Sequence, residues 1–121
     1  MRILIADDDI ISRRVLEVTL RKWGYDLVVT CDGRQAWEAI LEFRPDVLLL
    51  DVMLPGVDGF EVCHRLRQEP ATAKVPIVLV SAKGRREDVE TGLRVGANEY
   101  MTKPLSRVNL LATVKKLLEA A

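Results

Sequence analysis

The sequence predicts an α/β fold in which one parallel β-sheet carries helices on both faces. Five short apolar runs, suited to buried strands, alternate with five longer stretches of helical periodicity. The connections between them are short, as in chains that wind strand–helix units around a single sheet. With 121 residues the chain has the length of one ordinary domain, and no repeat or linker divides it. We therefore expect residues 1–121 to form one doubly wound domain.

The first strand, helix and second strand follow one another closely. Residues 3–6 form an apolar run that predicts a buried strand. Residues 10–23 have helical periodicity, and Gly24 ends this helix because glycine readily adopts the left-handed conformation found after helix ends. Trp23 is expected to be half exposed, and residues 27–29 predict the second strand. The stripe expected to face the core consists of Val15, Leu16, Thr19 and Leu20.

A second helix is expected to begin at Asp32. The Asp32 carboxylate is a good N-cap, and Gln35, three positions later, completes a capping box. Pro45 prevents the helix from continuing. Residues 47–50, Val-Leu-Leu-Leu, predict the third strand, and their unbroken apolar character suits a parallel strand covered on both faces. The residues of the second helix expected to point inward are Ala36, Trp37, Ile40 and Leu41.

The next unit begins with a turn and contains the third helix and the fourth strand. Pro55, Gly56 and Gly59 predict the turn, because proline and glycine supply the backbone conformations that turns require. A helix is expected over about residues 60–68, and residues 76–80 predict a strand.

The last unit contains two helices around the fifth strand. The polar segment 83–88 is expected to start the fourth helix, which ends near Gly96. Residues 99–102 predict the fifth strand, and Ser106 is expected to cap the last helix. The apolar stripe of that helix consists of Leu110, Val114, Leu117 and Leu118.

Composition narrows the function and the location. Eighteen basic and eighteen acidic residues give zero formal net charge, whereas nucleic-acid-binding domains carry a basic surplus. We therefore expect no direct binding to nucleic acid. The apolar runs are too short to cross a bilayer, and the N-terminus lacks the apolar segment of a signal peptide, so we expect a cytoplasmic domain without membrane contact. Cys31 and Cys63 belong to no Cys/His cluster and are expected to be free buried thiols.

Polar residues follow four of the predicted strands. Three acids at positions 7–9 follow the first strand, Asp51 the third, Ser81 the fourth and Lys103 the fifth. In doubly wound sheets, ligands bind beyond the carboxyl ends of the strands, so we expect these side chains to meet at one edge. A cis Lys103–Pro104 bond is predicted to direct the lysine ammonium towards Asp51.

The acids at this edge predict a site for a divalent cation and for phosphoryl transfer. Crowded carboxylates repel one another, and a bound cation relieves the repulsion. Hard oxygen ligands that remain open to water suit Mg²⁺, which shares its coordination sites with phosphate oxygens. A carboxylate such as Asp51 can attack phosphorus, and Lys103 and Ser81 can neutralise and orient the phosphoryl group. Taken singly, Lys103 would be interpreted as an ordinary surface lysine and Asp9 as a helix N-cap. For Asp9 we keep the interpretation as an N-cap.

Four segments resemble the receiver domain of bacterial two-component response regulators. The resemblance covers the whole chain in the order and spacing of that family. It implies a flavodoxin-like (βα)5 fold with five parallel strands in the order 2-1-3-4-5. The segments are 3–9 (ILIADDD), 51–59 (DVMLPGVDG), 80–83 (VSAK) and 96–105 (GANEYMTKPL).

The resemblance implies that Asp51 is the phosphoacceptor of a signalling switch. The phosphoryl donor would be a sensor histidine kinase or a phosphotransfer protein. The chain would not be an enzyme with a separate substrate. The implied ligands of Mg²⁺, for which Mn²⁺ is expected to substitute, are the carboxylates of Asp7, Asp8 and Asp51 and the backbone carbonyl of Met53.

The resemblance also implies how the signal leaves the site. Ser81, Ala82 and Lys103 would bind the phosphoryl oxygens, and Ser81 and Tyr100 would form the switch. The fourth helix, fifth strand and fifth helix, residues 85–119, would then present a changed surface to a partner, an output domain or a second copy of the chain.

Three alternative functions are disfavoured. An aspartate-nucleophile phosphatase needs a second Asp two residues after the nucleophile, where this chain has Met53. A flavodoxin-like cofactor carrier would meet repulsion between its phosphate group and the acids at positions 7–9. A receiver that has lost phosphorylation would lack one of the site residues, all of which are present here. The sequence leaves open the cognate kinase, the output, and whether the receiver stands alone or belongs to a longer protein.

Overall fold

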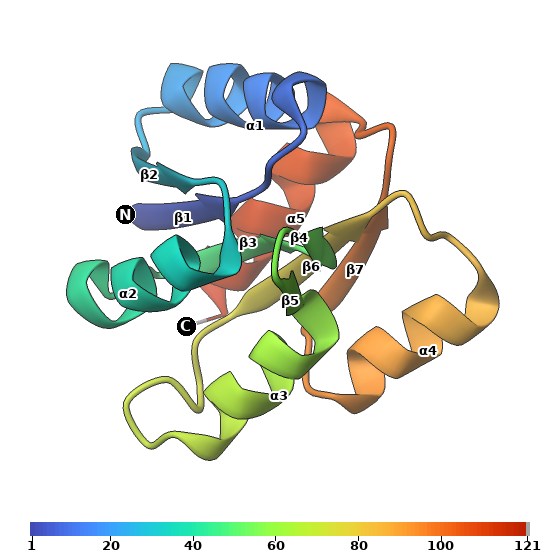
Figure 1. Cartoon of the computed structure of the whole chain (residues 1–121). Helices are drawn as coiled ribbons and strands as arrows, with labels where there is room; N and C mark the ends of the chain where they lie inside the picture. The colour runs from blue at the N-terminus through green and yellow to red at the C-terminus, as the bar shows by residue number, and fades with distance from the viewer. Residues whose placement is uncertain (121) are drawn as a thin grey trace.

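A computed structural model describes residues 1–120 and contains one five-stranded parallel sheet (Figure 1). Its order is β2-β1-β3-β6-β7, which is 2-1-3-4-5 when only these five strands are counted. The predicted fold class and strand order are therefore confirmed. The strands are β1 (Arg2–Ala6), β2 (Asp26–Thr30), β3 (Val47–Asp51), β6 (Ile77–Ser81) and β7 (Glu99–Thr102).

Helices cover both faces of the sheet (Figure 1). On one face, α1 (Ile10–Lys22) and α5 (Arg107–Glu119) pack against Ile3, Ile5 and Leu49. On the other face lie α2 (Gly33–Phe43), α3 (Gly59–Gln68) and α4 (Arg86–Arg94). Successive side chains of a strand point to opposite faces, so β1, β3 and β6 bury both sets and are apolar almost throughout. Full burial of each large aliphatic side chain contributes about 1.5–3 kcal/mol to stability.

Local signals in the sequence account for most helix ends. The Asp32 carboxylate accepts a hydrogen bond from the Gln35 N–H at 2.8 Å, as predicted. The predicted capping box does not form. The Gln35 side-chain oxygen accepts from the Cys31 N–H, at 3.4 Å, and not from the N–H of the N-cap residue Asp32. At the end of α1, Gly24 has the expected left-handed conformation, with φ of 81°. Ser106 caps α5 by accepting from the Asn109 N–H at 3.3 Å.

A short hairpin that the sequence pattern did not predict lies between β3 and α3. It consists of β4 (Met53–Leu54) and β5 (Val57–Asp58), which pair antiparallel. Pro55 and Gly56 form the turn, and the φ of 78° at Gly56 fits the third position of a type II turn. Strands of two residues are too short to show an alternating pattern, which explains why only the turn was predicted.

Three further expectations were wrong. Helix α4 begins at Arg86 rather than near residue 83, because residues 82–85 form a loop at the end of β6. Leu41 is 47% exposed, because it lies beside the buried face of α2, which Ile40 and Phe43 turn towards the core. Cys31 is exposed, because it follows the edge strand β2, whereas Cys63 is buried as expected, and both thiols are free. Within residues 1–120, no helix combines the length and the apolar character needed to span a membrane.

Candidate functional site

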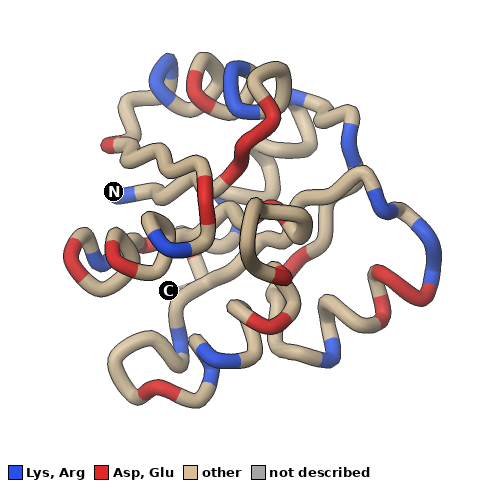
Figure 2. Tube along the Cα trace, in the orientation of Figure 1, with Lys and Arg blue, Asp and Glu red and all other residues tan. Residues whose placement is uncertain are grey.

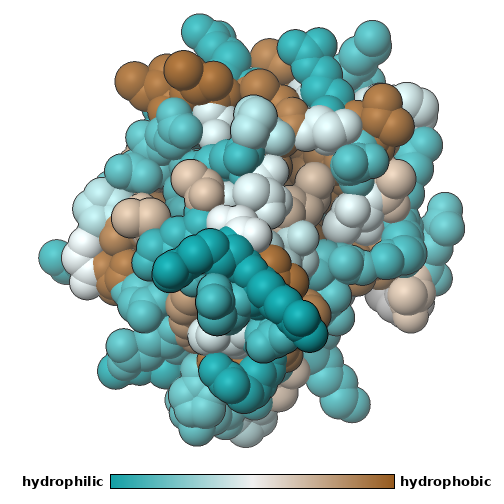
Figure 3. All heavy atoms as spheres, turned by 90° about the vertical axis from the view of Figure 1, so that its right-hand side faces the viewer, coloured by the Kyte–Doolittle hydropathy of each residue, from teal (hydrophilic) through white to brown (hydrophobic). Residues whose placement is uncertain are grey.

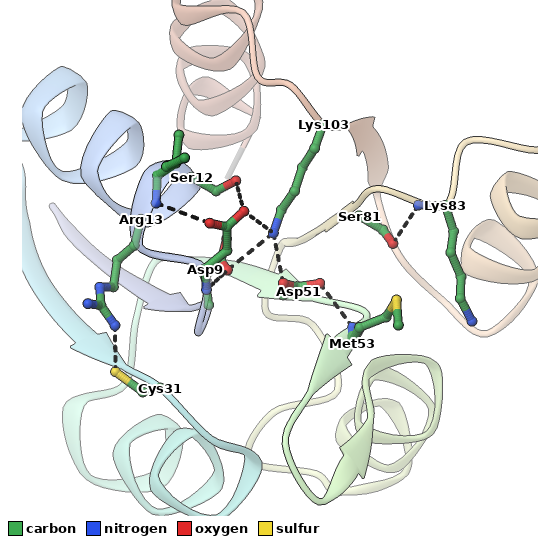
Figure 4. Close-up of polar contacts among 11 residues, drawn as sticks. Asp9, Ser12, Arg13, Cys31, Asp51, Met53, Ser81, Lys83 and Lys103 are labelled. Atoms are coloured by element: carbon green, nitrogen blue, oxygen red, sulfur yellow. Dashed lines mark hydrogen bonds and ion pairs between the residues drawn. The ribbon is translucent and has the colours of Figure 1, made fainter.

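The carboxyl edge of the sheet brings the predicted site residues together (Figure 4). Asp51 ends β3 and Ser81 ends β6, while Asp7 and Lys103 each follow the last residue of their strand. Parallel register places Ser81 beside Thr102, so Lys103 leaves β7 next to Ser81, and its N–H donates to the Ser81 carbonyl at 2.8 Å. Figure 2 shows the acidic run that follows β1 at this edge.

The Lys103 ammonium lies between carboxylates from two strands. Its Nζ donates to Asp51 Oδ2 at 2.8 Å and to Asp7 Oδ1 at 3.2 Å, and it lies 3.7 Å from Asp9 Oδ2. The Lys103–Pro104 bond is cis, as predicted. Burial opposes the charged form, but the hydrogen bond to Asp51 and the charges of Asp7 and Asp51 outweigh burial and raise the pKa of Lys103. Lys103 is therefore held as a cation at the site.

Asp51 is buried, and each of its two carboxylate oxygens accepts a hydrogen bond. The N–H of Met53 donates to Oδ1 at 2.9 Å, and Lys103 donates to Oδ2. Close packing behind this residue depends on Gly59, whose N–H donates to the Val52 carbonyl at 2.8 Å. A Cβ at position 59 would lie 2.7 Å from the Asp51 carbonyl oxygen, so only glycine allows α3 to begin this close to the end of β3.

Asp7 carries the clearest sign that the site is incomplete without a cation. Its side chain is 1% exposed, and Oδ1 accepts hydrogen bonds from Lys103 and from the Asp9 N–H. The other oxygen, Oδ2, is buried and has no hydrogen-bond partner among residues 1–120. Burial raises the pKa of Asp7 to about 6, against the opposing effects of the Asp9 N–H and of Lys103. A buried carboxylate oxygen without a partner is costly unless a cation or a proton occupies it.

Three carboxylates at the site fit a small divalent cation. Asp7, Asp8 and Asp51 each offer an oxygen, and these three oxygens all lie within 4.8 Å of one another. Asp8 is exposed, so the cluster is open to water on that side. Oxygen ligands that leave room for water and phosphate are those that Mg²⁺ prefers. The unpartnered Asp7 Oδ2 is consistent with the same cation.

The residues expected to form the switch are linked through Lys83. The fully buried Ser81 hydroxyl accepts a hydrogen bond from the Lys83 N–H at 3.0 Å. The Tyr100 hydroxyl donates to the Lys83 carbonyl at 2.5 Å, and its ring lies against Gly92 of α4. Burial of this ring raises the pKa of Tyr100. Tyr100 thus lies beside α4 rather than at Asp51. Ala82, between Ser81 and Lys83, is exposed.

Asp9 caps α1, as expected, and also contributes to the electrostatics of the site. Its carboxylate accepts from the Ile11 N–H at 3.1 Å and from the Ser12 hydroxyl at 3.0 Å. The Ser12 hydrogen bond is the main reason that the pKa of Asp9 is lowered. Ser12 was not predicted as part of the site, although its position three residues after an N-cap was a usable signal.

An open cleft of about 420 Å³ leads to the site. Asp8 borders it, together with the exposed side chain of Met53 and with Lys83 on the opposite loop. Val52, the residue after Asp51, also lines this cleft, so the cleft opens beside the end of β3. The backbone carbonyl of Met53 was predicted to be a metal ligand, and the observed role of this residue is the N–H contact to Asp51.

Sequence comparison identifies relatives over nearly the whole chain. The family described as "Response regulator receiver domain" matches residues 3–115. The DNA-binding response regulator MtrA of Mycobacterium tuberculosis is 45% identical over 117 residues, which cover 97% of this chain and 50% of MtrA. The chain spans about half the length of the known relatives that it matches first.

Two solved receiver domains closely match the structure. The BeF₃-activated receiver domain of Klebsiella pneumoniae RstA is 33% identical, with a TM-score of 0.89 and 98% of each chain covered. The receiver domain of the sensor histidine kinase PA1611 of Pseudomonas aeruginosa has a magnesium ion coordinated in its active-site cleft. It is 30% identical, with a TM-score of 0.88, and the alignment covers 98% of this chain and 97% of that one.

Proposed function

This chain belongs to the response regulator receiver domain family, and we propose that Asp51 is the phosphoacceptor of its signalling switch. A receiver domain is a switch rather than an enzyme with a separate substrate, and a histidine kinase is the partner that the family implies. An Asp51 carboxylate oxygen attacks the phosphorus of a phosphohistidine donor. The phosphorus–nitrogen bond breaks, the imidazole leaves, and an aspartyl phosphate remains.

The residues around Asp51 have separate tasks in this proposal. Asp7, Asp8 and Asp51, with the Met53 carbonyl, hold Mg²⁺, and Mn²⁺ can replace it. The cation supplies positive charge that offsets the negative charge of the phosphoryl oxygens. Lys103 offers an ammonium that is already directed at Asp51 Oδ2, 2.8 Å away.

Ser81 and Ala82 complete the proposed phosphoryl site from the other side. Both lie where β6 ends, beside Lys103, which leaves β7 at the same level. The Ser81 hydroxyl supplies one hydrogen bond to a phosphoryl oxygen, and the Ala82 N–H supplies a second. The resulting shift of the Ser81 hydroxyl is the event that carries the signal to Tyr100.

The observation that carries the proposal is the pairing of buried Asp51 with Lys103 beside the unpartnered Asp7 oxygen. Incubation with acetyl phosphate and Mg²⁺, followed by intact-mass measurement, should add one phosphoryl group. Asp51→Asn should abolish this addition, as should removal of Mg²⁺ by a chelator. Asp32→Asn is the matched control, because Asp32 also follows a strand of the sheet, β2, and asparagine also caps helices. Labelling that persists in Asp51→Asn would assign the phosphoacceptor to another residue.

We also propose the organisation of the signalling protein around this site. Residues 1–121 form a single cytoplasmic receiver domain, phosphorylated by a sensor histidine kinase or a phosphotransfer protein. The output surface is α4, β7 and α5, residues 85–119, and an output domain or a second copy docks there. The support is that β7 is an edge strand of the sheet, and that Tyr100 of this strand shares Lys83 as a hydrogen-bond partner with Ser81.

A further inference from the structure

A pocket that the proposed function does not use lies at the edge of the sheet opposite to Asp51. We name it the α2 end pocket, and its volume is about 390 Å³. It lies between the end of α2, which leads into β3, and the loop of residues 69–76, which leads into β6. Both are on the left in Figure 1, where the strands of the sheet begin. The apolar residues that line it are Ile40, Leu41, Pro45, Ala71 and Val75.

The size and lining of this pocket fit a small molecule. Pockets that bind small ligands have volumes of about 300–1,000 Å³ and a mostly apolar lining with a few polar groups. Leu41 is 47% exposed, so an apolar ligand in the pocket would cover side-chain surface that now faces water. On the side of the molecule that carries α4, by contrast, hydrophilic atoms dominate the lower half of the visible face (Figure 3).

The loop that forms one wall of the pocket is held in place by hydrogen bonds. The Arg67 guanidinium donates to the Val75 carbonyl at 2.6 Å and to the Gly96 carbonyl at 2.9 Å. The buried Thr72 hydroxyl, which belongs to a residue lining the pocket, donates to the Leu66 carbonyl at 2.7 Å. A wall that is already ordered reduces the entropy lost when a ligand binds. The Thr72 hydroxyl is satisfied within the chain, which leaves Arg44 as the polar group that can select a ligand.

Arg44 gives the pocket its charge. It is the one charged residue among those lining the pocket within residues 1–120. No carboxylate in the same residues forms an ion pair with it. Asp46, two positions later, accepts instead from the Arg2 N–H at 2.7 Å. An arginine without a partner beside an apolar lining is complementary to an anion that carries an apolar group.

The backbone of Arg44 is a second sign that its side chain has a task. Arg44 ends α2 in the left-handed conformation, with φ of 52° and ψ of 68°. It is the only residue other than glycine with a positive φ within residues 1–120. Helix ends of this kind ordinarily carry glycine, which adopts the conformation without steric cost. Strained positions of this kind are concentrated at ligand and active sites.

We propose that the α2 end pocket binds a small carboxylic acid with an apolar body. The body, aromatic or branched aliphatic, lies between Leu41, Ala71 and Val75, and the carboxylate pairs with the Arg44 guanidinium. Inorganic phosphate fits less well, because the rest of the lining is apolar. A nucleotide fits less well, because its phosphates need more than one cation. This inference goes beyond the proposed phosphorylation of Asp51 and does not depend on it.

A pair of matched probes tests the pocket directly. 4-Phenylbutyrate carries an apolar body and a carboxylate, and 4-phenylbutyramide has nearly the same shape without the charge. In an NMR titration of the full chain, 4-phenylbutyrate should shift the amides of residues 40–45 and 71–75, with a dissociation constant on the order of 1 mM. The amide should bind about tenfold more weakly. Shifts that avoid these two segments, or equal affinities for the two probes, would overturn the proposal.

Removal of the charge tests the role of Arg44. Arg44→Gln should reduce the affinity for 4-phenylbutyrate about tenfold, to the level of the amide. Arg34→Gln is the matched control, because it removes an exposed arginine at the start of the same helix, and it should leave the affinity unchanged. Equal losses in the two variants would show only a general charge effect and would overturn the assignment to Arg44.

Filling the pocket tests its apolar part. Ala71 lines the pocket and is exposed, so Ala71→Phe should fold with an unchanged Tm and occupy part of the volume. This variant should lose binding of 4-phenylbutyrate, and an unchanged affinity would overturn the proposed position of the ligand. Concentration-dependent dimerisation that Leu41→Asp abolishes would assign the surface to a second copy of the chain and overturn the choice of a small molecule.

Discussion

Asp7 and Lys103, the two residues that flank Asp51, show how burial and pairing oppose each other. Burial raises the pKa of Asp7 to about 6, whereas the carboxylates around Lys103 outweigh burial and raise its pKa. When ionised, the three carboxylates of the cation site and the one ammonium carry a net charge of −2 (3 negative, 1 positive). A divalent cation neutralises that charge, so cation binding and stability should be coupled at this site.

The first prediction concerns Asp7 without a metal. Its folded-state pKa of about 6 exceeds the ordinary value of 3.8, so the folded state binds the proton more tightly than the unfolded state. The free energy of unfolding therefore falls as pH rises from about 4 to 6, and the cost well above pH 6 is on the order of 3 kcal/mol. Asp7→Asn should remove this cost. The variant should have the higher Tm at pH 7.5 in the presence of a chelator, with the difference shrinking towards pH 4.

Two comparisons separate this effect from a general change of charge. Asp26→Asn changes a carboxylate at the exposed start of β2. In this variant the difference in Tm between pH 7.5 and pH 4 should be the same as in the parent chain. Added Mg²⁺ should raise the Tm of the parent chain more than that of Asp7→Asn. A lower Tm for Asp7→Asn at both pH values would mean that the hydrogen bonds of the carboxylate outweigh the cost of its burial.

Met53 is predicted to prolong the phosphorylated state. Its side chain is 56% exposed and borders the cleft beside Asp8 and Lys83. Hydrolysis requires a water molecule in line with the phosphorus, and a thioether orients water poorly, whereas an amide can hold it. Met53→Asn should therefore accelerate dephosphorylation about tenfold, measured as loss of the phosphorylated mass over time. Leu41→Asn, an exposed leucine of α2, is the control, and a slower or unchanged rate for Met53→Asn would contradict this role.

The strands and helices follow from periodicity and capping residues, and the departures have physical causes. All five strands and all five helices exist, and only α4 begins as much as three residues from its expected start. Residues 82–85 are polar enough to resemble a helix start. The Ser81 hydroxyl, however, accepts a hydrogen bond from the Lys83 N–H, and this segment stays a loop. The predicted stripe of α2 included Leu41, but the buried face of α2 consists of Ala36, Ile40 and Phe43, and periodicity alone does not show how wide that face is.

At the element scale, the start of α3 depends on Gly59. A Cβ there would lie 2.6 Å from the Val52 Cα and 2.7 Å from the Asp51 carbonyl oxygen. Backbone atoms cannot move aside as a side chain can, so Gly59→Ala should lower the free energy of unfolding by about 2–3 kcal/mol. It should also slow labelling of Asp51. Denaturant unfolding measures the first effect, and intact mass measures the second.

Gly84→Ala is the matched control for this prediction. Its added Cβ meets only the Thr102 side chain, at 2.7 Å, in an exposed loop, so its cost should be clearly smaller. Equal destabilisation by the two variants would show that the backbone approach at Gly59 is not special.

At the scale of the whole molecule, the site could be predicted from the strand order and the strand ends. The hydrogen bonds within the site could not be predicted. The positions of Asp7, Asp51 and Lys103 after buried strands were enough to expect their contact. Which oxygen of Asp7 stays without a partner depends on packing that no local pattern encodes. The same holds for the link from Ser81 through Lys83 to Tyr100, because these residues are brought together by the pairing of β6 with β7.

That link gives the last prediction, which concerns how phosphorylation changes the whole domain. Beryllofluoride with Mg²⁺ stands in for the phosphoryl group on Asp51. If the Ser81 hydroxyl turns to this group, it releases the Lys83 N–H, and the loop that also binds the Tyr100 hydroxyl must rearrange. Chemical-shift changes should therefore extend from the site into residues 85–119. Tyr100→Phe, which lacks the hydroxyl, should reduce the changes in α4, whereas Tyr25→Phe, on the α1 side of the sheet, should not. Changes that avoid residues 85–119, together with unchanged partner binding by Tyr100→Ala, would show that the output uses another face.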